Sequence, residues 1–186
     1  MVPRRIAALL FVTSLLASPA LAAASATSVP HPVPVATRPA NPPKGTVTHL
    51  PLPRFVSLRS NDVNLRAGPG FQYPIKWVFR RRGLPVEVVR EFDVWRLVKD
   101  PFGAEGWVHE ATITGFRDFI VEGAERTMRR APSSGAPVVA RLMPGVIGRI
   151  LHCAAGSDWC ETKVDQHRGW LRRQDFWGSY AGEKVN

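Results

Sequence analysis

The chain has 186 residues, enough for one or two small domains, with 25 Lys and Arg against 15 Asp and Glu and a formal net charge of +10. With 45% hydrophobic residues, 15 glycines and 17 prolines, its composition excludes a collagen-like chain, a coiled coil and a wholly disordered protein. Its two cysteines are too few for a zinc ribbon or a dense disulfide scaffold.

The first 22 residues have the pattern of a signal peptide. Arg4 and Arg5 precede an apolar run over residues 6–16, and the alanines at 20 and 22 form an A-x-A cleavage box. This run of 11 residues is too short to cross about 30 Å of hydrocarbon, which argues against a membrane anchor. We expect cleavage after residue 22, with residue 24 as the alternative. The mature protein is then periplasmic or secreted, without a transmembrane segment.

Residues 23–53 contain eight prolines and no aromatic residue. Because proline lacks an amide donor and fixes φ, neither a helix nor a sheet can propagate through this segment. We expect a disordered or polyproline II linker. A ligand for a proline-binding domain is the alternative interpretation of this composition.

From residue 54 onward, short β-rich runs alternate with turn residues, and no helical periodicity stands out. In the first half of this region the pattern predicts strands at residues 56–59, 63–66, 76–80, 86–91, 94–99 and 106–109. Strands this short must curl to bury one face, so we expect a partly open barrel of about five strands.

The pattern then recurs at an offset of 62 to 64 residues. The aligned pairs are residues 64–69 with 127–132, 73–75 with 136–138, Gly83 with Gly145, Trp95 with Trp159, and 106–108 with 169–171. We therefore predict an all-β protein with two barrels in tandem, one over residues 54–116 and a divergent one over residues 117–186.

Several motifs in the first repeat resemble the bacterial Src-homology-3-like (SH3) domain: V-N-L-R-A-G-P-G at 63–70, the Gly83 turn, Trp95, and Gly106-Trp107-Val108. The resemblance covers about 56–115 and, more weakly, 118–178, where Met128, Arg129 and Pro132 remain of the first motif. The ending at 172–178 is similar to exported tandem proteins of alphaproteobacterial kind. The resemblance implies small β-barrels that in some members bind cell-wall peptides or other ligands. In enzymes such domains accompany a separate catalytic domain, and none is recognisable in this sequence.

These observations predict an exported, non-enzymatic binding or scaffold protein at the cell envelope, without a cofactor. The expected partner is a peptidoglycan peptide or a periplasmic protein, and nucleic acid is not expected. One alternative is an accessory of a cell-wall hydrolase, or an enzyme whose site is not recognisable. Another is a structural protein in which the two barrels pack as one rigid body.

The candidate ligand-binding residues are Arg66, Tyr73, Trp95 and Trp159. Strand alternation puts Trp159 on the same face as polar residues 161 and 163, which predicts a partly exposed ring. For Trp95 the alternation is ambiguous. Arg66 either contacts a ligand or braces a loop carbonyl or carboxylate. No helix follows the glycines after Arg66, so they set a turn more readily than they hold a phosphate.

Two further tryptophans, Trp107 and Trp170, follow glycine and start apolar strands, which predicts core positions. The basic run at 80–82 precedes the Gly83 turn and is typical of a solvated turn. Contact with an anionic glycan or a lipid headgroup is the alternative for this run.

Cys153 and Cys160 flank a hairpin-like connection of six residues, and in an exported protein this pair should oxidise. Closing so short a loop stabilises the fold by about 2.5 kcal/mol at most. The aligned residues of the first repeat are Glu91 and Arg96, where a salt bridge would span the same turn. Two alternatives are a metal site with a nearby histidine, at residue 152 or 167, and a catalytic Cys–His pair. We predict the disulfide and no metal site.

Overall fold

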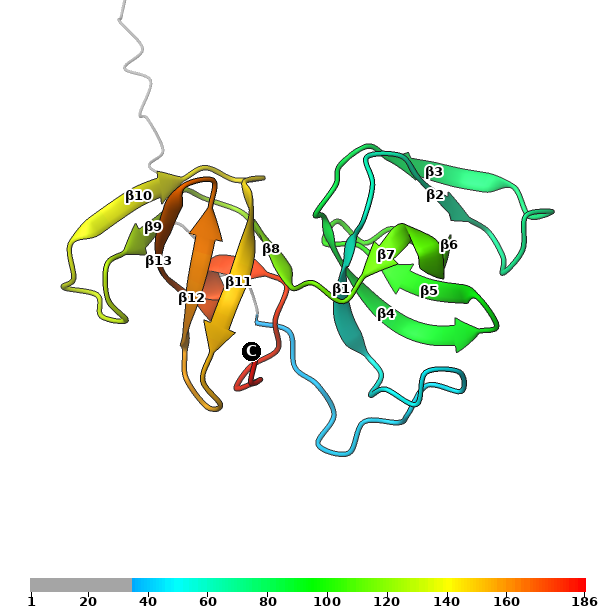
Figure 1. Ribbon diagram of the computed structural model, residues 1–186, viewed down its shortest axis with the longest axis horizontal. Coiled ribbons are helices and arrows are strands. Elements are labelled where there is room, and N and C mark those ends of the chain that lie inside the picture. Colours follow the sequence, from blue (N-terminus) through cyan, green and yellow to red (C-terminus); the bar gives the residue numbers. More distant parts are fainter. Residues whose placement is uncertain (1–34) are drawn as a thin grey trace, which may run out of the picture.

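The computed structural model describes residues 35–186. The expected signal peptide, its cleavage site and residues 23–34 of the expected linker lie outside the described residues. Figure 1 shows two β-barrels side by side, joined by the segment between β7 (Ile113–Thr114) and β8 (Asp118–Val121). The all-β, two-barrel prediction is confirmed. Within the described part of the chain, no helix is both long and apolar enough to span a membrane.

Seven antiparallel strands form the first barrel, in the spatial order β3-β2-β6-β5-β4-β1-β7. A one-turn 3₁₀-helix, η1 (Glu110–Thr112), leads into β7. The other strands are β1 (Arg54–Leu58), β2 (Val63–Arg66), β3 (Ile75–Phe79), β4 (Pro85–Phe92), β5 (Trp95–Lys99) and β6 (Glu105–His109). All six expected strands are present. The two-residue β7 was missed because a strand that short has no periodicity to detect.

The second barrel repeats the same seven-stranded arrangement in the order β10-β9-β13-β12-β11-β8-β14. Its remaining elements are β9 (Arg126–Arg129), β10 (Val138–Leu142), β11 (Ile147–Cys153), β12 (Trp159–Val164), β13 (His167–Arg172), η2 (Arg173–Asp175) and β14 (Phe176–Trp177). The irregularities of strand pairing match as well. The register of β4 against β5 shifts between Val88 and Arg90, and that of β11 against β12 shifts between Ile150 and His152. The tandem repeat therefore holds strand by strand.

Each barrel encloses its own apolar core. Alternate residues of the strands point inward, as with Val63 and Leu65 in β2 and Val86 and Val88 in β4, all of them buried. In the second barrel the core includes Phe119, Met128, Leu142, Ile150 and Leu171.

Side chains of the second barrel also reach the core of the first. Ile120 belongs to the first barrel's buried cluster, and Trp177 packs against that cluster. The ring of Phe55 lies 4.6 Å from the ring of Trp177 and 4.7 Å from the ring of Tyr180. The Tyr180 hydroxyl donates a hydrogen bond to Glu87 Oε1 at 2.7 Å. The two barrels are therefore packed together through an apolar interface.

The described part of the expected linker, residues 35–53, differs from the disordered spacer predicted for it. This N-terminal strap (residues 35–53) starts beside the C-terminal segment and then runs along the first barrel to β1 (Figure 1). Near its start, the amide of Ala181 donates to the Ala36 carbonyl at 2.9 Å, and Arg38 pairs with Glu183 at 3.3 Å. Near its end, Leu52 is buried in the first core. Proline prevents a regular ladder in this segment but does not prevent extended chain from packing on a core that other residues supply.

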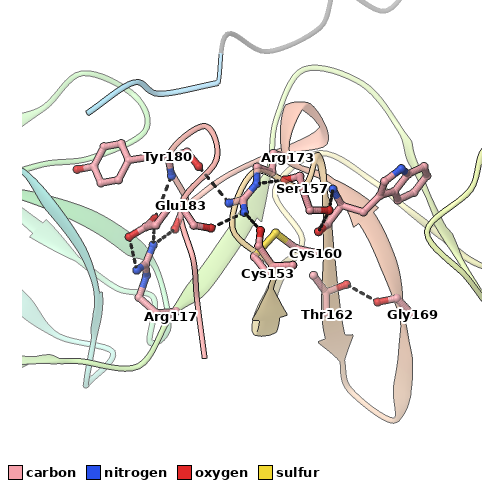
Figure 2. Close-up of a disulfide and its surroundings, with 12 residues drawn as sticks. Arg117, Cys153, Ser157, Cys160, Thr162, Gly169, Arg173, Tyr180 and Glu183 are labelled. Atoms are coloured by element: carbon pink, nitrogen blue, oxygen red, sulfur yellow. Dashed lines mark hydrogen bonds and ion pairs between the residues drawn. A yellow bond between two sulfur atoms is a disulfide. The ribbon is translucent and has the colours of Figure 1, made fainter. Parts of the chain in front are cut away.

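A disulfide joins Cys153 and Cys160, as predicted (Figure 2). Beside it, the buried Arg173 donates to the carbonyls of Ser157 at 2.6 Å, Tyr180 at 3.0 Å and Ala154 at 3.3 Å. These bonds hold the C-terminal segment against the end of the second barrel. Because both cysteines are in the disulfide, neither can be a thiolate ligand of the metal site considered as an alternative. Among residues 35–186, no group of three or more His, Cys, Asp and Glu side chains is placed to hold a metal ion.

Candidate functional site

The loop from residue 67 to residue 74, between β2 and β3, is braced by Arg66. One guanidinium nitrogen of Arg66, Nη1, donates to the carbonyl oxygens of Phe71 at 3.1 Å and Tyr73 at 2.8 Å. The loop closes on itself where the amide of Ala67 donates to the Pro74 carbonyl at 3.0 Å. Of the two roles considered for Arg66, the structure shows the bracing role. Arg66 therefore shapes the loop that carries the exposed rings.

An aromatic cluster covers this end of the first barrel. The Phe71 ring lies 5.0 Å from Trp95 and stacks 5.7 Å from the His109 ring. Phe71 is 70% exposed, whereas Trp95 beneath it is only 5% exposed. Trp95, for which strand alternation did not decide between a buried and an exposed position, is therefore buried. In this cluster the ring exposed to a ligand is that of Phe71.

Tyr73 lies on the same loop and packs against Gly68. A Cβ at Gly68 would approach the tyrosine ring to 2.5 Å, so glycine is what allows this close contact. Tyr73 is 40% exposed and lines a shallow groove of about 440 Å³ together with Pro69, Arg90 and Trp107. Trp107 is buried, as predicted.

The second barrel builds the same loop, residue for residue, at an offset of 63. Arg129 Nη1 donates to the Ala136 carbonyl at 2.8 Å, and the amide of Arg130 donates to the Pro137 carbonyl at 2.9 Å. With this register, Ser134 stands where the first barrel has Phe71. The second barrel therefore has no large ring to cover its tryptophan.

A cavity of about 270 Å³ opens at this point of the second barrel. Its walls, which we name the Trp159 site, are formed by Glu125, Arg126, Thr127, Arg129, Ser134, Trp159, Arg172, Gln174 and Asp175. The Arg172 guanidinium lies over the Trp159 ring, 5.1 Å from its centroid. Trp159 is partly exposed, as the strand alternation predicted, while Trp170 is half-buried rather than fully in the core.

Both signs of charge line the Trp159 site. The guanidinium of Arg126 lies 3.6 Å from a carboxylate oxygen of Asp175. Burial raises the pKa of the Asp175 carboxyl, although Arg126 and the amide of Arg172 act against that shift. Glu125 and Arg172 stand near the exposed end, where Arg172 also hydrogen-bonds Ser134. Such a site suits a small ligand that carries both a carboxylate and an amine.

The four candidate residues therefore divide between two matching places, with Arg66, Tyr73 and Trp95 on the first barrel and Trp159 on the second. Residue-type reasoning missed Phe71, His109 and Arg172. The repeat alignment pairs Phe71 with Ser134 and His109 with Arg172, but these unlike residues give no sign in the sequence that they lie beside the aligned tryptophans.

The fold and this repeated loop define an all-β protein with two tandem SH3-like barrels. The bacterial SH3 domain family matches residues 59–115 and 122–178. These two matches cover more than half of the chain, which therefore belongs to that family.

No curated protein matches this chain. Among solved structures, NlpC2 from Trichomonas vaginalis is similar at 10% identity and a TM-score of 0.31, over 68% of this chain and 48% of that one. NlpC1 from the same organism is similar at 10% identity and a TM-score of 0.31, over 73% and 49% of the two chains. This chain spans about half the length of those structures, and a similarity at this level carries no argument about function.

Proposed function

We propose that this protein is an exported, non-enzymatic binding protein of the cell envelope, which recognises peptidoglycan peptides through the Trp159 site. The observation that carries the proposal is the exchange of Phe71 for Ser134 in two loops with the same hydrogen bonds. The first barrel shows that the fold accepts a large ring at this position. In the second barrel no ring stands at this position; the Arg172 guanidinium lies over Trp159 and hydrogen-bonds Ser134, and an open hollow lies beside them.

The chemistry of the site matches a stem peptide of the cell wall. Such peptides carry carboxylates, an amine on their dibasic residue, and the small methyl groups of alanine. The Trp159 ring offers a flat apolar surface for the methyl groups, and Arg172 offers a charged donor for a carboxylate. Glu125, at the exposed rim, would accept the amine in exchange for the Arg141 guanidinium, with which it pairs at 2.9 Å.

Two features support an exported location. The Cys153–Cys160 disulfide fits an oxidising compartment, where such bonds form and persist. The N-terminal pattern of arginines, an apolar run and a small-residue box is typical of a signal peptide. The expected partner therefore lies outside the cytoplasm, as peptidoglycan does.

Calorimetric titration of the oxidised protein with a synthetic stem tetrapeptide tests the proposal. The substitution Ser134→Phe gives the second barrel the residue that fills the first, and we expect it to weaken binding by about tenfold or more. The matched control is Ser133→Phe, which adds the same ring to the neighbouring exposed residue outside the cavity lining. Circular dichroism checks that both variants are folded. Binding that Ser134→Phe leaves unchanged, or no binding by the unsubstituted protein, would overturn the proposal.

A further inference from the structure

A larger hollow lies between the two barrels, apart from the Trp159 site. This inter-barrel cleft has a volume of about 930 Å³ and takes its walls from both barrels. Arg59 and Arg82 come from turns of the first barrel, while Arg149 on β11 and Lys163 on β12 come from the second. The cleft exists only because the barrels are packed together, so neither barrel alone would form it.

The charge of the cleft is predominantly positive. Four cationic side chains line it against two carboxylates, Asp118 and Asp165. Arg149 already pairs with Asp118. Within residues 35–186, the side chains of Arg59, Arg82 and Lys163 are exposed and form no ion pair. These three cations keep their charge available to a ligand, with Asp165 as the one carboxylate that opposes them.

The walls of the cleft are held at a fixed separation. Ser57 of the first barrel donates to the Phe116 carbonyl at 2.8 Å and accepts from the amide of Asp118 at 3.0 Å. The turn at Gly83 has a φ of +79°, and a Cβ there would lie 3.4 Å from both Asp118 and Ile147. Glycine at this position thus permits the left-handed backbone of the turn, which lies in van der Waals range of Asp118 and Ile147. A pre-formed cleft loses little entropy when a ligand enters it.

An exposed aromatic ring completes the cleft. Phe116 is 59% exposed, and the Arg149 guanidinium lies 4.3 Å from its ring centroid. A flat ring next to several cations is the surface that an acidic sugar can use, since its apolar face stacks on the ring and its carboxylate or phosphate meets the cations. A membrane surface is a poorer fit, because its headgroups lie in a plane while these cations line a concavity.

We propose that the inter-barrel cleft binds an anionic polysaccharide, whose acidic groups pair with Arg59, Arg82 and Lys163 while one sugar ring lies on Phe116. This site does not depend on the Trp159 site. The protein would then hold an acidic glycan and a wall peptide at separate places.

The test uses oligogalacturonate as the probe, with its methyl-esterified form as the neutral counterpart, and the full oxidised chain as the protein. We expect saturable binding of the charged probe that weakens with added salt, and no binding of the ester. The triple substitution Arg59→Gln, Arg82→Gln and Lys163→Gln should weaken binding by about tenfold or more. Ser134→Phe should leave it unchanged, which separates this proposal from the one on the Trp159 site.

The matched control removes the same amount of charge elsewhere, by Lys44→Gln, Lys99→Gln and Lys184→Gln, three exposed lysines outside the cleft lining. It should weaken binding by less than about threefold, since distant exposed charges are largely screened. An equal loss in both triple variants would show that general charge, and not the cleft, holds the probe. Binding to anionic phosphatidylglycerol vesicles without binding to oligogalacturonate would overturn the proposal in favour of a lipid surface.

Discussion

Glu91 faces Arg96 across the β4–β5 hairpin at the register position that the disulfide occupies in the second barrel. Cys153 and Cys160 pair between β11 and β12 in the same way, each pair one step beyond the register shift. The carboxylate of Glu91 lies 3.9 Å from the Arg96 guanidinium. The salt bridge expected for the first repeat is therefore present, but it is buried rather than exposed.

Glu91 also ties the N-terminal strap to the first barrel. Its carboxylate accepts hydrogen bonds from the amides of Val47 and Thr48, each at 2.9 Å, from the Thr48 hydroxyl at 2.6 Å, and from Arg54 at 2.7 Å. The first barrel thus fastens its hairpin through a buried anion, and the second barrel fastens its own through a covalent bond.

Substituting Glu91→Gln should lower the free energy of unfolding by about 3 kcal/mol, because buried guanidinium groups lose their counter-charge. The control is Glu110→Gln. Glu110 is the other carboxylate partner of Arg96, and the Glu110 side chain is 44% exposed. That change should cost less than about 1 kcal/mol. Urea denaturation measures both values, and equal losses would contradict the role given to Glu91.

Stability should fall in acid through the same carboxylate. Burial alone raises the pKa of Glu91, but the hydrogen bonds from Thr48, Val47 and Arg54 outweigh it and lower the pKa from 4.5 to about 2. Since the folded state holds the anion more strongly than the unfolded chain, Glu91 stabilises the fold above about pH 4.5. This contribution, about 3 kcal/mol, is lost as the pH falls toward 2. Denaturation curves from pH 6 to about pH 2 should therefore slope less steeply with pH in Glu91→Gln than in the parent protein.

Reducing the disulfide should weaken the second barrel more than the first. The closed loop from Cys153 to Cys160 is short, so its loss costs about 2.5 kcal/mol at most by loop-closure entropy. Hydrogen exchange with and without reductant measures the effect, with the amides of β11 and β12 compared against those of β4 and β5. Equal acceleration in the two hairpins would mean that both barrels unfold as one cooperative unit.

Phe55→Ala should loosen the contact between the barrels. Phe55 is 3% exposed and packs against Trp177 and Tyr180 of the second barrel, so its truncation should cost about 3 to 4 kcal/mol. The control is Phe102→Ala. Because Phe102 is 73% exposed, its truncation should lower the free energy of unfolding only a little. Calorimetry of Phe55→Ala should show a broader transition or two transitions. A single sharp transition, shifted no further than that of the control, would contradict the interface described above.

Phe71→Ser should uncover Trp95 and make the first barrel resemble the second. The tryptophan fluorescence should shift to longer wavelength and become more accessible to iodide, because Phe71 is the ring that lies over Trp95. The same substitution at the exposed Phe102 supplies the control. An emission spectrum identical to that of the control would show that Phe71 does not shield Trp95.

The sequence was most informative where each repeat constrains the other. The offset of about 63 residues located the second barrel and aligned Cys153 and Cys160 with Glu91 and Arg96, while strand alternation predicted the partly exposed Trp159. Because Cys153 and Cys160 align with Glu91 and Arg96, the sequence already predicted a disulfide across one hairpin and a salt bridge across the other.

Contacts between segments that share no local pattern were the ones the sequence did not predict. The prolines of the strap indicated that it forms neither a helix nor a regular strand. They did not indicate that Leu52 would pack in the first core or that Thr48 would bond to Glu91. Likewise, nothing local to Phe71 shows that its ring covers Trp95, 24 positions later in the chain. Such contacts depend on how the barrel brings loop and hairpin together.

The most direct test of peptide recognition is retention of the purified, oxidised protein on isolated cell-wall sacculi, with free stem peptide as competitor and salt as a second variable. For recognition through the Trp159 site we expect saturable retention that the free peptide displaces and that Ser134→Phe weakens strongly, while Ser133→Phe leaves it unchanged. No retention at low salt, or retention that neither the peptide nor Ser134→Phe reduces, would contradict it.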